Sequence, residues 1–245
     1  MNKLDKIAGM YKVENEFDIV LMKHNFEIAR KYFKGRDFLE LGCATGESTI
    51  KLIPFARTVD VVEGSFNNIS IAKKKIRKVG LSKNKQVIFY HSDWLKFNYG
   101  RNRYSDVIWF RGLEHIKEPD LLLKKIVQSL KPNGRLHIVT QNAFSLHRKI
   151  GTAMGLLKEP HQLNERDHKV GHFKVYDLNQ IKHLIKKSRF KLISWHGIML
   201  KPLPNKDMLK IYQENPKFVQ GLYEVGKELP SLCAELYVCA TLAKD

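Results

Sequence analysis

Short apolar runs and helix-forming stretches alternate along most of the chain. The apolar runs predict strands at residues 38–41, 58–65, 86–93, 105–110, 135–141, 191–199 and 234–242. Helices are predicted at residues 20–33, where apolar and charged positions alternate at helical spacing, and at 46–53, 66–79, 120–130 and 177–188. Repeated strand–helix units of this kind predict a doubly wound α/β fold around a mostly parallel sheet.

Two segments interrupt this alternation, residues 142–176 and residues 200–233. Both are long for connections in a compact domain, and loops of such length are usually functional or partly helical. No repeat, low-complexity tract or linker divides the chain. We therefore predict a single domain over residues 1–245, in which the two insertions form a lid.

Composition narrows the class of protein. The chain has 245 residues, of which 43% are hydrophobic, enough for one sizeable core. No apolar run reaches the roughly 18 residues of a transmembrane helix, and the charged N-terminal stretch has no apolar signal segment. Three scattered cysteines argue against a disulfide framework. We expect a cytoplasmic protein without a membrane span.

The net charge of +18 favours anionic partners. Nucleic acid, an acidic membrane surface and a phosphate-bearing small substrate all fit such a charge. Charge alone does not choose among them.

The turn after the first predicted strand, in FLELGCATGES at residues 38–48, combines two glycines with an acid. Gly42 and Gly46 allow the backbone to pass close to a ligand. Glu40 precedes the turn, Glu63 ends the second predicted strand, and Asp93 ends the third. In a doubly wound sheet, ligands bind beyond the carboxyl ends of the strands, and an acid after the second strand can accept both ribose hydroxyl hydrogens.

The same residues distinguish between cofactors. A dinucleotide site uses G-x-G-x-x-G to cradle a pyrophosphate, and the turn G-C-A-T-G lacks that spacing. Glu40 would repel a pyrophosphate but suits a cation. S-adenosylmethionine carries a sulfonium, an ammonium group and a ribose, which acids can meet. Each acid taken singly is equally explained as a solvated strand end or a helix cap.

The stretches FLELGCATGEST, VDVVEGS, HSDW and DVIWFRGLEHIKEPDLLLKKIVQSLKPNGRLHIVTQ carry a resemblance. Over about residues 36–141 the chain resembles class I S-adenosylmethionine-dependent methyltransferases. That resemblance implies a Rossmann-like fold with a mostly parallel seven-stranded sheet and a reversed C-terminal hairpin. More loosely, residues 141–205 are similar to small-molecule methyltransferases of bacterial surface-glycan (polysaccharide) gene clusters.

The resemblance also implies how S-adenosylmethionine, and its product S-adenosylhomocysteine, are held. Glu40 would lie near the methionine end, Glu63 would hold the ribose, and Asp93 would accept from the adenine amino group. Ala44 stands where the family's turn has a middle glycine. The cofactor-binding residues expected are Tyr11 (in a segment that could close over the cofactor), Glu40, Gly42, Cys43, Gly46, Glu63, Gly64, Ser65, Asp93, Trp94 and Arg111.

Two histidines are predicted as general bases for the acceptor. His115 follows the fourth predicted strand in WFRGLEHI, and His172 lies in the first insertion. Each could instead be a structural histidine that packs or hydrogen-bonds a loop. We expect no metal, because the spacing of His161, Glu165, His168 and His172 is not diagnostic.

The first insertion also offers groups that could contact an acceptor. Its apolar residues suit one helical face that could shield the reaction from water: Phe144, Ile150, Met154 and Leu157. Its cations could meet a phosphate or carboxylate, although a solvated surface charge is the more common explanation for any single one of them: Arg148, Lys149, Arg166, Lys169 and Lys174.

We therefore predict transfer to oxygen or nitrogen of a small, anionic acceptor, such as a sugar, a nucleotide-linked sugar or a phosphorylated metabolite. A nucleic-acid methyltransferase is the main alternative. Its support is a basic run: Lys73, Lys74, Lys75, Arg77, Lys78, Lys83 and Lys85. No Asn-Pro-Pro-Tyr-like motif and no Pro-Cys dipeptide accompanies that run. A nicotinamide-dependent oxidoreductase and a noncatalytic cofactor-binding partner are further alternatives, and the oligomeric state stays open.

Overall fold

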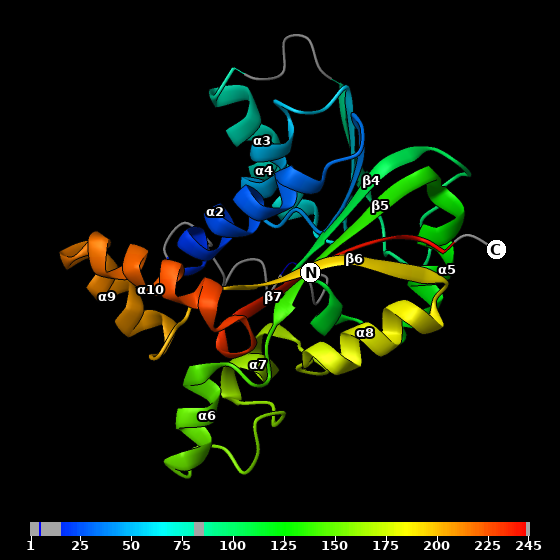
Figure 1. The fold of residues 1–245 in the computed structure, drawn as a ribbon. Coiled ribbons are helices and arrows are strands. Elements are labelled where there is room, and N and C mark those ends of the chain that lie inside the picture. The colour runs from blue at the N-terminus through cyan, green and yellow to red at the C-terminus, as the bar shows by residue number, and fades with distance from the viewer. Residues whose placement is uncertain (1–4, 6–15, 81–85, 244–245) are drawn as a thin grey trace.

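The computed structural model describes residues 5, 16–80 and 86–243 (Figure 1). Its sheet has seven strands in the order β3-β2-β1-β4-β5-β7-β6. The strands are β1 (Asp37–Leu41), β2 (Thr58–Glu63), β3 (Gln86–His91), β4 (Tyr104–Phe110), β5 (Leu130–Gln141), β6 (Phe190–Ile198) and β7 (Glu235–Leu242). Strands β1 to β5 pair in parallel, whereas β7 pairs antiparallel with both β5 and β6. The predicted sheet with its reversed C-terminal hairpin is confirmed.

Helices cover both faces of the sheet. The α-helices described are α2 (Asp18–Ala29), α3 (Glu47–Leu52), α4 (Phe66–Lys78), α5 (Pro119–Ser129), α6 (Leu146–Ala153), α7 (Glu165–Val170), α8 (Leu178–Lys187), α9 (Asn205–Glu214) and α10 (Pro216–Glu228). Short 3₁₀ turns are η2 (Arg30–Tyr32), η3 (Leu113–His115) and η4 (Pro230–Leu232). Figure 1 shows α3 and α4 on one side of the sheet and α5 and α8 on the other.

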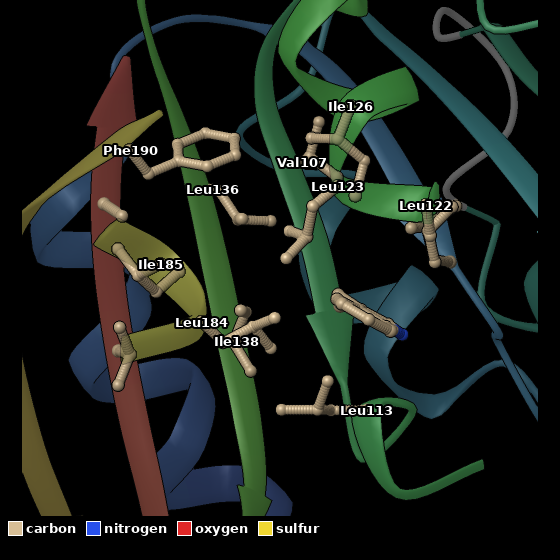
Figure 2. Packing of buried hydrophobic residues seen from close by; sticks show 14 of the residues in the cluster. Val107, Leu113, Leu122, Leu123, Ile126, Leu136, Ile138, Leu184, Ile185 and Phe190 are labelled. Atoms are coloured by element: carbon tan, nitrogen blue, oxygen red, sulfur yellow. The ribbon is translucent and has the colours of Figure 1, made fainter. Parts of the chain in front are cut away.

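Alternation along the strands explains this layering. Leu39 and Leu41 of β1 pack with residues of α5 and α8, whereas Phe38 packs with residues of α3 and α4. Successive strand side chains point to opposite faces, so a strand covered on both sides must be apolar at nearly every position. Figure 2 shows the larger core, in which Leu123 and Ile126 of α5 lie over Val107 of β4.

The reversed strand brings distant segments to one edge of the sheet. Glu235, the first residue of β7, pairs with Gln141 at the end of β5 and with Ile198 at the end of β6. The start of β7 therefore lies at the edge where the parallel strands end. Both insertions also emerge there, the first after β5 with α6 and α7, the second after β6 with α9 and α10.

Among the described residues, none of the helices has the length and apolar character needed to cross a bilayer.

Candidate active site

The glycine turn after β1 requires both of its glycines. Gly42 and Gly46 have φ of 79° and 90°, in the left-handed region that favours glycine. A Cβ at Gly42 would lie 2.9 Å from the Trp94 ring, and one at Gly46 would lie 2.7 Å from the Ala72 Cβ. Ala44, at φ 44°, also adopts a left-handed conformation. The methyltransferases that the chain resembles have glycine at this position. The turn is thus tightly packed against the second and third strand–helix units.

Glu40 lies under this turn and is almost completely buried. Its carboxylate accepts hydrogen bonds from Ser48 Oγ and, at 2.6 Å, from Thr49 Oγ1, both on α3. Burial raises the pKa of Glu40 to about 7, although these two hydrogen bonds act in the opposite direction. Because the pKa of Glu40 lies near 7, a cation placed beside it would favour the charged carboxylate.

Glu63, at the end of β2, braces the two neighbouring turns. Its Oε2 accepts from the Ala44 backbone N–H at 3.1 Å, and its Oε1 accepts from the Ser65 backbone N–H at 2.9 Å. Burial raises the pKa of this carboxyl. The Cys43 thiol lies 3.9 Å from Oε2, and burial raises its pKa well above the usual value. Cys43 is therefore a protonated, packed side chain at neutral pH.

Ser65 caps α4 and is already engaged. Its hydroxyl accepts from the Asn68 backbone N–H at 3.2 Å and donates to Asp5 Oδ1 at 2.6 Å. The neighbouring carbonyl of Gly64 lies 3.1 Å from His91 Nε2. Asp5 and His91 are side chains at this edge that the sequence did not single out.

Asp93 and Trp94 complete the first half of the site. Asp93 is exposed, and its Oδ1 accepts from the Leu95 backbone N–H at 2.7 Å. Trp94 donates from Nε1 to the Val62 carbonyl at 3.2 Å. The structure thus gathers most of the predicted cofactor residues at the carboxyl ends of β1, β2 and β3. They are Glu40, Gly42, Cys43, Gly46, Glu63, Gly64, Ser65, Asp93 and Trp94. Tyr11 falls outside the described residues.

Arg111 faces a different neighbourhood. It has a φ of 53°, and its guanidinium lies 3.1 Å from Asp18 of α2 and 3.1 Å from Glu235 of β7. Both carboxylates are buried. A contact between Arg111 and the cofactor stays a prediction, whereas the ion pairs tie the end of β4 to α2 and to the start of β7.

The two predicted bases lie side by side. The His115 and His172 rings are 4.6 Å apart in an edge arrangement, and the Phe173 backbone N–H donates to the Glu114 carbonyl at 2.8 Å. His172 Nδ1 is 2.9 Å from Asp167 Oδ1. Burial lowers the pKa of His115, so its imidazole is neutral at pH 7. The first insertion therefore places an Asp–His pair next to the residues that follow β4.

The cations predicted to meet an acceptor do not converge. Arg148 is buried and donates to the Pro160 carbonyl at 2.7 Å and to the Gln162 carbonyl, with Asp167 at 3.5 Å. Lys169 pairs with Glu165 at the surface. Arg148 therefore stabilises the loop that follows α6. None of its contacts supports a direct role in acceptor binding.

The predicted apolar inner face of the first insertion is wrong. Phe144, Ile150 and Met154 are 38%, 37% and 67% exposed, so these side chains point toward solvent. The face of α6 that is buried carries Arg148 instead. Of the four grouped residues only Ile150 lies within α6, because the helix begins after Phe144 and ends before Met154 and Leu157.

Two histidines of the first insertion, His161 and His172, have separate acidic partners. His161 Nε2 lies 2.9 Å from Asp177, whereas His172 is held by Asp167. Within residues 16–80 and 86–243, no three His, Cys, Asp or Glu side chains are grouped to hold a metal ion.

A buried polar cluster at the ends of β6 and β4 was missed. Lys201 Nζ donates to Asn205 Oδ1 at 2.9 Å, and Asn205 Nδ2 donates to Asp18 Oδ1 at 2.7 Å. Asn25 Nδ2 donates to Glu235 Oε2 at 2.7 Å. The available signal was Lys201 itself, a charge that directly follows the apolar run at the end of β6.

A family model described as a methyltransferase domain matches residues 16–194. The chain is 28% identical over 148 residues to the ubiquinone/menaquinone biosynthesis C-methyltransferase UbiE of Pasteurella multocida, covering 56% of this chain and 53% of the relative. It is 28% identical over 111 residues to the ubiquinone biosynthesis O-methyltransferase of Bartonella bacilliformis, covering 45% and 43%. The chain thus spans about half the length of the curated relatives it matches.

A solved structure extends the likeness over nearly the whole chain. The N-methyltransferase NodS from Bradyrhizobium japonicum, in complex with S-adenosylhomocysteine, superposes with a TM-score of 0.59. The match covers 93% of this chain and 88% of NodS at 11% identity, so it bears on the fold alone.

Proposed function

We propose, on the premise that this chain belongs to the methyltransferase domain family, that it transfers a methyl group from S-adenosylmethionine to a small acceptor. The observation that carries the proposal is the group of acids at the ends of β1, β2 and β3 around the glycine turn. Glu40, Glu63 and Asp93 end or follow three neighbouring parallel strands. An acidic edge of this kind suits a positively charged adenosyl donor and disfavours a pyrophosphate.

Each acid has a distinct part in binding. Glu40 offers a buried negative charge to the cationic methionine end. Glu63, whose oxygens already accept from the Ala44 and Ser65 backbone N–H groups, would also accept from the ribose hydroxyls. Asp93, exposed beside Trp94, accepts from the adenine amino group. Because backbone N–H groups fix Glu63 beforehand, little ordering entropy is lost on binding.

S-adenosylmethionine, when bound, supplies a methyl group activated by its sulfonium. The chain's residues align the acceptor with that methyl and remove the acceptor's proton. Asp167 would accept from His172 Nδ1–H, which leaves the Nε2 lone pair to accept a proton. Nε2 would take up the proton that the acceptor oxygen or nitrogen loses when it is methylated. Alignment in such displacements contributes on the order of 7–11 kcal/mol in favourable cases.

The acceptor we propose is a sugar, a nucleotide-linked sugar or a phosphorylated metabolite. Support comes from the net charge of +18 and from the looser resemblance to glycan-cluster enzymes. The curated relatives bear names of carbon and oxygen methylation in quinone biosynthesis. The oxygen or nitrogen chemistry proposed here would use the Asp167–His172 pair, since both acceptor types must lose a proton.

Thermal unfolding with added ligands tests the cofactor assignment. S-adenosylhomocysteine should raise the unfolding midpoint and NAD should not, because only a ligand that binds the folded state stabilises it. Stabilisation by NAD alone would contradict the proposal. A crystal structure with S-adenosylhomocysteine would then identify the side chains beyond the sulfur.

The nucleic-acid alternative makes a different prediction. Exposed cations of α4 would retain nucleic acid at low salt and release it at moderate salt. Two of these cations have intramolecular partners, since Lys75 pairs with Glu47 at 2.8 Å and Lys73 lies over the Phe89 ring. Salt-sensitive copurification together with methylation of RNA or DNA would favour the alternative.

A further inference from the structure

Lys201 is a buried lysine that lacks a paired carboxylate. Only 5% of its surface is exposed, and it lies in the second insertion, just beyond the end of β6. Its one hydrogen bond goes to Asn205 Oδ1, a neutral acceptor, and no carboxylate of the described residues lies within ion-pair distance. Arg111 and Arg148, in contrast, lie within 3.5 Å of carboxylates.

An ammonium group in this position is costly for the folded protein. A lysine has three donors, and transfer of an unpaired charge from water into the interior costs several kcal/mol. Burial lowers the pKa of Lys201 to about 8, although Asp18 and Glu235 act in the opposite direction, so the ammonium still carries its charge at pH 7. Asn205 satisfies one donor, which leaves two without a partner among the described residues. An incoming anion would accept from the remaining donors.

Two further polar groups near the start of α6 have no hydrogen-bond partner among the described residues. One is His147 Nδ1, and burial together with the nearby Lys201 lowers the pKa of His147 to about 3, so its imidazole is neutral. The other is Ser145 Oγ, two residues earlier and also buried. Buried polar groups are rarely left unpaired, so such a concentration needs an explanation.

The location fits the acceptor side of the reaction. Ser145 and His147 follow β5, and Lys201 follows β6. Both segments therefore leave the sheet at the edge where Arg111 follows β4. This edge adjoins the carboxylates of β1 and β2 and also carries the Asp167–His172 pair. A molecule held here by Lys201 would reach both the methyl donor and the proposed base.

We infer that Lys201, assisted by His147 and Ser145, binds a carboxylate or phosphate group of the methyl acceptor. The inference rests on the proposed function and names the part of the acceptor that the chain recognises. It also distinguishes this chain from an enzyme whose acceptor has only uncharged polar groups. Lys201 acts in binding and takes no part in the proton transfer.

Calorimetry on the protein loaded with S-adenosylhomocysteine tests the inference. Inorganic phosphate and acetate serve as separate probes, because phosphate represents a phosphoryl acceptor and acetate a carboxylate. We expect saturable binding of at least one anion, weakened about tenfold or more by Lys201→Met, which removes charge-assisted hydrogen bonds. Lys206→Met is the matched control, an exposed lysine of the same insertion, and should bind as the unmodified protein does.

Three measurements keep the outcome unambiguous. Lys201→Met should unfold at the same temperature or higher, because methionine replaces an unpaired buried charge by an apolar chain of similar length; Lys201→Gln serves if it does not. Equal anion binding by Lys201→Met, or no saturable binding of either anion, overturns the inference. Titration of S-adenosylhomocysteine itself reports separately on the cofactor site, so a failure of the proposed function is recognised independently.

Discussion

The two halves of the site are built in different ways. At the ends of β1, β2 and β3, the acids are held by groups close in sequence or on the next turn, such as Ser65 N–H for Glu63 and Thr49 for Glu40. At the ends of β4, β6 and β7, the partners come from far apart, such as Asn25 with Glu235 and Asn205 with Asp18. The first half is organised by local turns and the second by tertiary packing.

The charges differ as much as the connectivity. The cofactor half contains carboxylates whose pKa is raised by burial, namely Glu40 and Glu63. The acceptor half also has a buried carboxylate with a raised pKa, Glu235, but adds groups whose protonated form is disfavoured, namely His115, His147 and Lys201. A cation suits the first half, whereas the second half offers cationic and neutral donors beside its carboxylates. The difference indicates that one half is specialised for a fixed donor and the other for the identity of the acceptor.

The largest effect we expect comes from the base. His172→Ala should lower turnover by about 10²–10⁴-fold, because proton removal by a positioned side chain contributes that much. Affinity for S-adenosylhomocysteine, measured by calorimetry, should be unchanged, since His172 belongs to the acceptor half. Turnover requires an acceptor found in a screen of phosphorylated and nucleotide-linked sugars.

Two further variants separate a base from a packing residue. Asp167→Asn should shift the pH profile of turnover, because the amide no longer stabilises the imidazolium. His115→Ala tests the adjacent ring, which burial keeps neutral. If both histidine variants turn over normally, the general-base proposal must be abandoned.

The next effect concerns the ribose acid. Glu63→Ala should weaken S-adenosylhomocysteine binding by roughly 100-fold, since charge-assisted hydrogen bonds contribute about 1.5–3 kcal/mol each. Calorimetry gives the affinity, and circular dichroism checks that the fold survives loss of the brace between Ala44 and Ser65. Unchanged affinity in a folded variant would remove the ribose assignment.

The contrast in construction explains what sequence could predict. Glycines and acids after apolar runs are local signals, so Gly42, Gly46 and Glu63 could be singled out from the sequence, and the structure brings them together at one edge of the sheet. The mostly parallel sheet was also predicted, because strand–helix units alternate along the chain, and the reversed C-terminal hairpin was implied by the family resemblance. The ends of the predicted strands differ from those of the structure by a few residues, the largest difference being at the start of β5.

The acceptor half was less predictable because its contacts join residues far apart in sequence. Nothing near Arg111 indicates that its partners are Asp18 and Glu235. The orientation of α6 could not be inferred either, since its apolar and charged faces compete for burial and Arg148 is buried with carbonyl partners. Lys201 carried a signal, a charge at the end of a buried strand, but only the structure reveals that it lacks a paired carboxylate.

A smaller effect follows from the pKa of Glu40, which is about 7. Below that pH the carboxyl is protonated and neutral, so a cationic cofactor should bind about tenfold more weakly for each pH unit, and affinity should level off above it. In the cofactor-free protein the same raised pKa stabilises the folded state below about 4.5, and this contribution is lost as the pH rises through 7.

Calorimetry at pH 6 in buffers of different ionisation enthalpy would detect the proton that Glu40 releases when S-adenosylmethionine binds. Glu40→Gln should abolish that release and flatten the pH dependence of affinity. A pH-independent affinity in the unmodified protein would show that Glu40 does not sense the cofactor's charge.

The smallest effect is expected at Asp93, the exposed member of the acidic group. Its Oδ1 is engaged by the Leu95 backbone N–H, and an adenine amino group would compete with water for the other oxygen. Asp93→Ala should therefore weaken S-adenosylhomocysteine binding only about fivefold, near 1 kcal/mol for a solvent-exposed hydrogen bond. Asp93→Asn, which keeps an acceptor for both partners, should retain most of the affinity. A loss of affinity as large as that of Glu63→Ala would mean that the adenine end is enclosed more fully than the exposure of Asp93 indicates. Tertiary packing would then shape the cofactor half as well as the acceptor half.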